Sequence, residues 1–70
     1  MIIENIKELG TVIRQCRKNQ RVTQRQVAAL AGVSPRLVSE LERGKVTIEI
    51  GRAFRVAQTV GLTIEVKGEI

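Results

Sequence analysis

The chain of 70 residues contains no histidine, no tryptophan and no tyrosine, and it has one cysteine, one proline and one phenylalanine. Without histidine, and with a single thiol, the sequence offers no zinc-finger spacing, no internal disulfide and no Cys/His catalytic pair. A glycine-rich phosphate-binding loop is also missing. We therefore expect no cofactor and no bound metal, and we do not expect an enzyme.

Long apolar runs are missing as well. No stretch approaches the ~18 consecutive apolar residues of a membrane span, and residues 1–5 lack the basic region and apolar run of a secretory signal. A lone cysteine fits a reducing compartment. These features predict a cytoplasmic, nucleoid-associated protein with no membrane partner.

The length of the chain allows one domain, spanning residues 1–70. A chain this short buries about 60% of the surface that its unfolded form exposes. With Phe54 as the single aromatic residue, the core must consist of Ile, Leu, Val and Ala. Association with a second subunit is one way in which such a small core gains stability.

Positive charge is concentrated in the middle of the chain. The net charge is +5, but residues 14–45 hold eight basic and two acidic residues, which gives +6, and the remainder carries −1. Such a segment is typical of a surface that faces phosphates. A solvated basic face with no ligand is the alternative interpretation.

Start and stop signals predict three helices up to Gly44. The first helix begins after Asn5, a capping residue with Glu8 three positions on, and Gly10 inside it would permit close approach of another element. Its inner stripe is Ile6, Leu9, Ile13 and Cys16.

The second helix follows a capping box of Thr23 and Gln26, buries Val27, Leu30 and Ala31, and ends at Gly32. Ser34 and Pro35 begin the third, which runs to Arg43 with Val38 and Leu41 inward.

A fourth helix is predicted over about residues 48–60, with Gly61 as its stop and a start delayed by Gly51. Residues 62–66 then alternate between apolar and polar, as a half-buried strand does. Residues 1–3 are the sole and very short candidate for a partner strand, so we expect pairing with the same strand of a second subunit. The dimerisation residues would be Leu62, Ile64 and Val66. A frayed tail is the alternative.

Two short helices joined by a tight glycine turn define a helix-turn-helix. Ala28 supplies the small residue that helix two needs against helix three, and Gly32 supplies the turn. The sequence resembles the Cro/C1-type (XRE) helix-turn-helix family over about residues 9–66. The resemblance rests on Thr23, Gln24, Val27, Ala28, Ala31, Gly32, Val33, Ser34, Val38, Ser39, Leu41, Glu42, Arg43, Gly44 and Lys45. It implies an all-α, lambda-repressor-like domain of four to five helices.

Within that family the chain resembles HipB-like antitoxins, including the Y4mF type, at Leu9, Gly10, Ile13, Arg14, Arg17 and residues 62–66. This resemblance implies a homodimer that joins its C-terminal strands, represses its own operon at double-stranded DNA and binds a HipA-type kinase toxin. A stand-alone phage-type or chromosomal repressor is the alternative. A protein-interaction module that does not bind DNA is a third hypothesis.

Candidate DNA-binding residues follow from how a recognition helix enters the major groove, with its N-terminal end foremost. Arg36, Ser39, Glu40 and Arg43 lie opposite Val38 and Leu41, and Ser34 and Pro35 lie at the helix start. Arg36 suits a guanine and Glu40 a cytosine amine, although Glu40 could instead pair with Arg36 at i, i+4. Gln24 resembles the family glutamine that meets a phosphate.

The remaining residues have two interpretations each. Arg25 and Lys45 would contact phosphates or remain solvated, and Leu37 would touch a thymine methyl or pack on the first helix. Cys16 fits the core better than a redox sensor. Arg17 and Glu42 fall where the family places a partly buried ion pair, so the resemblance implies that they pair with each other and do not read bases.

Overall fold

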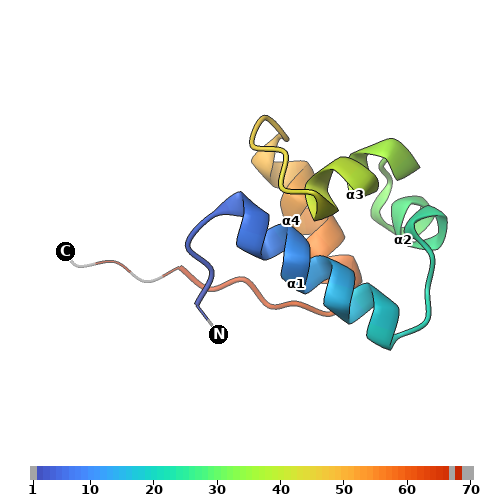
Figure 1. Ribbon diagram of the computed structural model, residues 1–70, viewed down its shortest axis with the longest axis horizontal. Helices are drawn as coiled ribbons and strands as arrows, with labels where there is room; N and C mark the ends of the chain where they lie inside the picture. Colours follow the sequence, from blue (N-terminus) through green and yellow to red (C-terminus); the bar gives the residue numbers. More distant parts are fainter. Residues whose placement is uncertain (1, 67, 69–70) are drawn as a thin grey trace.

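Four helices make up the computed structural model, which describes residues 2–66 and 68. They are α1 (Ile6–Asn19), α2 (Gln24–Ala31), α3 (Pro35–Glu42) and α4 (Ile50–Thr59). In Figure 1, α2 and α3 lie at one end of the molecule. Residues 2–5, which we call the N-terminal segment, and residues 62–66 lie toward the other end. None of the described helices is long and apolar enough to cross a bilayer. The all-α fold is as predicted.

Side-chain caps fix where three of these helices begin, as the sequence predicts. Asn5 accepts the amide of Glu8 at 2.9 Å ahead of α1, and Ser34 accepts the amide of Leu37 at 3.1 Å ahead of α3. The capping box at α2 is reciprocal: the Thr23 hydroxyl accepts the Gln26 amide at 3.1 Å, and the Gln26 side chain accepts the Thr23 amide at 2.8 Å. The α4 helix has no such cap, and it begins at Ile50, two residues later than predicted.

The core consists of small and medium aliphatic side chains. Around it, α2 packs on both α3 and α4, and α1 packs on α3. Its largest fully buried members are Ile13, Leu41, Val27, Val38 and Val56. Ile6, Leu9, Cys16 and Leu37 are partly buried against it, so Cys16 lies at the core and Leu37 packs inward.

The prediction that Leu30 is buried is wrong, since this side chain is 79% exposed. The buried stripe of α2 is formed by Val27, Ala28 and Ala31. At 3.6 residues per turn, Leu30 lies about 100° around the helix from the centre of that stripe. Leu30 therefore lies at the side of the helix and not on its core face.

At Gly10, α1 lies directly against the backbone of α3. A Cβ atom built at this position would lie 2.1 Å from the carbonyl oxygen of Leu41 and 3.0 Å from that of Glu42. The absence of a side chain therefore sets the distance between the two helices. At the turn between α2 and α3, Gly32 adopts φ 72°, the left-handed conformation that the sequence predicts there.

The segment predicted as a C-terminal strand is extended but forms no strand within the described part of this single chain. Residues 62–66 run back past α1 toward the N-terminal segment (Figure 1). Leu62 and Ile64 pack on the core, whereas Val66 is 87% exposed. Residues 1–3 were the other candidate for a partner strand. Met1 lies outside the described residues, and Ile2 and Ile3 form no strand. Pairing across a dimer needs a second copy and stays a prediction.

Candidate nucleic-acid interface

The two faces of α3 differ sharply in burial. Val38 and Leu41 are completely buried, while the Arg36 side chain on the other face is 86% exposed. Ser34, Pro35, Arg43 and Lys45 are exposed, and Ser39 and Glu40 are half-buried. The candidate residues of this helix therefore share one accessible surface, which we call the α3 surface: Ser34, Pro35, Arg36, Ser39, Glu40, Arg43 and Lys45.

Below that surface, α3 is tied to α1 by an ion pair. The guanidinium of Arg17 donates to both carboxylate oxygens of Glu42, from Nε at 2.7 Å and from Nη2 at 3.0 Å. The side chains are only 12% and 3% exposed, respectively. Hydrogen bonding to Glu42 raises the pKa of Arg17 above its ordinary value against the opposing effect of burial. A third bond, from Nη1 to the Val22 carbonyl at 3.0 Å, fixes the loop before α2.

Gln24, the first residue of α2, joins this ion pair. Its side-chain amide donates to Glu42 Oε1 at 3.2 Å, so its nitrogen is engaged inside the protein. A residue that the sequence assigns to a phosphate thus also links α2 to α3. No periodic signal reveals this contact, because the two residues lie in different helices and are 18 positions apart.

Glu40 pairs with two cations of the α3 surface. Its Oε1 lies 3.3 Å from Nε of Arg36, which is the i, i+4 alternative that the sequence left open. Its Oε2 accepts from Nζ of Lys45, whose backbone amide also donates to the Glu40 carbonyl at 3.0 Å. The hydrogen bond from Lys45, and then the charges of Lys45, Arg36 and Arg43, hold the pKa of Glu40 below its ordinary value although partial burial acts against them.

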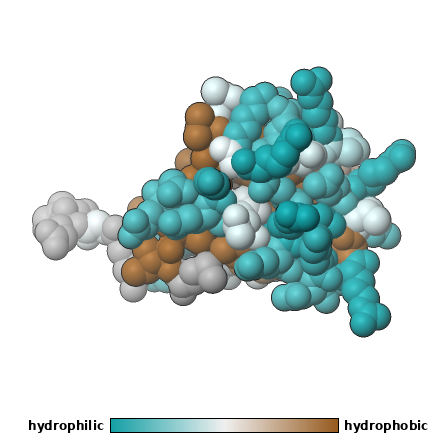
Figure 2. Space-filling view, viewed as in Figure 1, coloured by the Kyte–Doolittle hydropathy of each residue, from teal (hydrophilic) through white to brown (hydrophobic). Residues whose placement is uncertain are grey.

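Arg25 lies apart from these contacts as an exposed residue in the first turn of α2. Figure 2 shows hydrophilic side chains over the end of the molecule that carries α2 and α3, and apolar ones near the N-terminal segment and residues 62–66. We call the latter region the apolar end, although apolar side chains are also exposed elsewhere, at Leu30 of α2, Val46 and Ile50.

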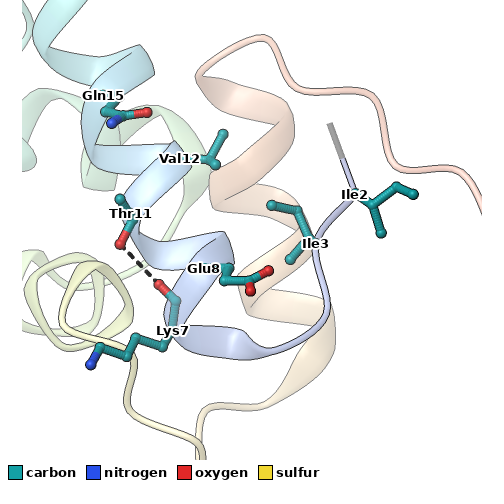
Figure 3. A pocket seen from close by; sticks show the side chains of 7 residues that line it. All are labelled: Ile2, Ile3, Lys7, Glu8, Thr11, Val12 and Gln15. Carbon is teal, nitrogen blue, oxygen red and sulfur yellow. Dashed lines mark hydrogen bonds between the residues drawn. The ribbon is translucent and has the colours of Figure 1, made fainter.

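The apolar end is hollowed by a groove of about 670 Å³ between the N-terminal segment, α1, α4 and residues 62–65. Leu9, Phe54, Leu62 and Ile64 are among the side chains that line it. An adjoining hollow beside α1 shares Ile2, Ile3 and Val12 with the groove and adds polar side chains of α1 (Figure 3). There the Thr11 hydroxyl donates to the Lys7 carbonyl of its own helix, at 3.1 Å.

The fold and the α3 surface together define a small helix-turn-helix domain: a capped α2, a glycine turn and an α3 whose charged face is open. The chain belongs to the helix-turn-helix family, whose sequence profile matches residues 13–67. The resemblance to Cro/C1-type (XRE) proteins is thereby confirmed.

Among relatives, the chain is 38% identical over 64 residues to y4mF of Sinorhizobium fredii (strain NBRC 101917 / NGR234), described as an uncharacterized HTH-type transcriptional regulator. That match covers 91% of this chain and 84% of the relative. Among solved structures, the HipB–O4 20mer complex superposes with a TM-score of 0.87 over 97% of this chain and 96% of the other, at 18% identity. The HipB–O1–O2 complex gives a TM-score of 0.86 over 97% and 99%, also at 18% identity. At 18% identity the likeness to the HipB complexes concerns the fold alone. The family match and the relative show that this chain is a helix-turn-helix protein of the transcriptional-regulator class.

Proposed function

We propose that this protein is a sequence-specific, DNA-binding transcriptional repressor in which α3 is the recognition helix. The observation that carries the proposal is the α3 surface, an open face with three basic residues and one acidic residue on a helix held from below by the Arg17–Glu42 ion pair. A fixed helix with an exposed polar face and basic residues at its ends suits the major groove, where base edges present distinct donor and acceptor patterns. The relative described as a transcriptional regulator supports the same assignment.

The proposed roles follow the position of each side chain. Arg36, exposed near the start of α3, reads a guanine, and Ser39 contacts the neighbouring base edge. The polar and cationic residues at the ends of α3 and at the start of α2 contact the DNA backbone, together with the proline that opens α3. This backbone group consists of Gln24, Arg25, Ser34, Pro35, Arg43 and Lys45.

We propose further that the protein acts as a homodimer on an inverted-repeat operator. Leu62 and Ile64 border the apolar groove, and Val66 projects beyond it with 87% of its surface exposed. Pairing of residues 62–66 about a two-fold axis would cover the apolar end. Two α3 helices would then meet successive turns of the duplex, ~34 Å apart or a multiple of that.

The biological context that we propose is a type II toxin–antitoxin system, in which this protein is a HipB-like antitoxin that represses its own operon in the cytoplasm and binds a HipA-type kinase toxin. The fold shared with HipB and the resemblance to the Y4mF type support this context. Co-expression of the tagged protein with the gene product encoded next to it tests the toxin partner. Recovery of a kinase-like protein in a stable complex is expected. A neighbour that does not bind would favour a stand-alone repressor.

DNA binding itself is tested by fluorescence anisotropy with a duplex carrying the promoter of the protein's own gene, at about 50 and about 200 mM salt. We expect affinity that falls steeply as salt rises, because bound Lys and Arg side chains release counterions from the phosphates. A scrambled duplex should bind more weakly. No salt-dependent affinity for either duplex would contradict the proposal and favour a protein-interaction module.

A further inference from the structure

Glu40 is the one acidic residue of the α3 surface, which also carries three basic residues. Residues 14–45 contain two acidic side chains. One of them, Glu42, is buried against Arg17 and only 3% exposed. Glu40 is therefore the acidic side chain of this segment that reaches the face opposite Val38 and Leu41, where its charge is held next to three cations.

Both of its carboxylate oxygens are engaged, each by a different cation. Oε1 faces Nε of Arg36 at 3.3 Å, and Oε2 accepts from Nζ of Lys45. Lys45 lies beyond the end of α3 and is anchored to Glu40 a second time through its backbone amide, at 3.0 Å. The carboxylate thus links a cation near the start of the recognition helix to one after its end.

This arrangement has two costs for binding DNA. A phosphate that approaches Arg36 or Lys45 must replace a carboxylate that already neutralises the cation. The carboxylate itself is repelled by the negative potential of the DNA unless a base amine donates to it, and among base edges in the major groove cytosine and adenine carry such an amine. Both costs apply to every sequence, but the second is relieved only at some sites.

We propose that Glu40 is a specificity-determining residue that suppresses non-specific DNA binding by holding Arg36 and Lys45 in ion pairs. It acts through these two cations rather than chiefly as a base-reading group. A cognate site compensates by giving Arg36 a guanine in a fixed position, whereas a random site offers Lys45 a phosphate but gives Arg36 no such partner. This inference rests on the proposed DNA-binding function.

The test compares the wild-type protein with Glu40→Gln, which keeps the shape of the side chain and removes its charge. A matched control is Glu4→Gln, which makes the same change in net charge at an exposed residue ahead of α1, outside the α3 surface. Dissociation constants are measured for an operator selected from a random pool and for a scrambled duplex of equal composition, at several salt concentrations. A thermal melt of each variant verifies that it is folded.

We expect Glu40→Gln to bind the scrambled duplex about two- to fivefold more tightly for each surface ion pair released. Its plot of log affinity against log salt should steepen by about 0.9 for each additional phosphate that the freed cations neutralise. Affinity for the operator should rise less than that or fall, so the ratio of the two affinities decreases. Glu4→Gln should change neither the ratio nor the slope. In a Lys45→Met background, Glu40→Gln should have a smaller effect on the slope, since one of the released cations is gone.

Two results would overturn the inference while leaving DNA binding intact. One is an unchanged affinity for the scrambled duplex with an unchanged salt slope. The other is an equal loss on both duplexes, which would indicate a structural role for Glu40. If neither the wild-type protein nor Glu40→Gln shows salt-dependent affinity for any duplex, the proposed function fails and this inference fails with it.

Discussion

Arg17 and Glu42 form a bidentate ion pair. Nε of the arginine lies 2.7 Å from Oε2 of the glutamate, and Nη2 lies 3.0 Å from Oε1. The contact joins α1 to the last turn of α3, and through Gln24 it reaches the first turn of α2. Three helices thus converge on one carboxylate directly beneath the α3 surface. The orientation of α3 is set by this contact together with the apolar core.

Loss of one partner of this pair should destabilise the fold before it affects DNA contacts. Arg17→Met leaves the Glu42 carboxylate buried without its counter-charge, so we expect the free energy of unfolding to fall by about 3 kcal/mol, the lower end of the range for buried pairs. Urea denaturation followed by circular dichroism measures the change. Arg14→Met, at an exposed position of the same helix, is the control and should be nearly neutral. Equal small losses for both would show that the pair contributes little.

The crossing of α1 and α3 predicts opposite outcomes for two glycine substitutions. Gly10→Ala adds a methyl group 2.1 Å from the Leu41 carbonyl, which is backbone and cannot move aside easily. We expect it to cost about 1–3 kcal/mol despite the better helix propensity of alanine. The control is Gly51→Ala in α4, whose nearest neighbour is the Glu49 side chain at 3.3 Å. It should be neutral or stabilising in the same melts, and a stable Gly10→Ala would disprove the close approach.

Two cations of the α3 surface should differ in what they contribute to DNA binding. Arg36→Ala should reduce discrimination at one base step by about 1–3 kcal/mol, because a bidentate contact to guanine is lost. Lys45→Ala should weaken binding to all sequences alike and lower the salt slope by about 0.9. Competition assays with single-base variants of the operator measure both effects. Equal losses for the two variants on scrambled DNA would contradict these assignments.

The proposed dimer can be tested on the segment after α4 without disturbing the core. Val66→Glu places a charge at an exposed position of the proposed interface, and we expect monomers by sedimentation analysis. Thr47→Glu is the matched control, because it adds the same charge at an exposed residue ahead of α4, outside residues 62–66. A Val66→Glu protein that remains dimeric would refute pairing through this face.

Most of the fold follows from local chemistry. Asn5, Thr23 and Ser34 cap their helices and Gly32 turns the chain, because each of these signals acts over three or four residues and depends little on the rest of the molecule. The exposure of Leu30 was not predictable in this way. It depends on which face of a two-turn helix packs inward. Hydrophobicity alone does not distinguish a face that contains Leu30 from one that contains Ala28.

The shared exposed face of the candidate residues on α3 was predictable from the sequence, but the contacts among them were not. The spacing of Arg36 and Glu40 predicts both a shared face and an ion pair. The contacts of Lys45 with Glu40 and of Gln24 with Glu42 arise where one helix ends and another begins, and helical periodicity does not extend across such junctions. The two-fold pairing of residues 62–66 involves a second chain and stays a prediction.

Selection of bound duplexes from a random pool tests most directly the claim that the α3 surface reads DNA. We expect the wild-type protein to enrich an inverted repeat whose half-sites lie about 10 base pairs apart, or a multiple of that. The Arg36→Ala protein should enrich the same repeat with one base step relaxed. Enrichment of no sequence by the wild-type protein, or of an identical sequence with undiminished preference by Arg36→Ala, would contradict the account.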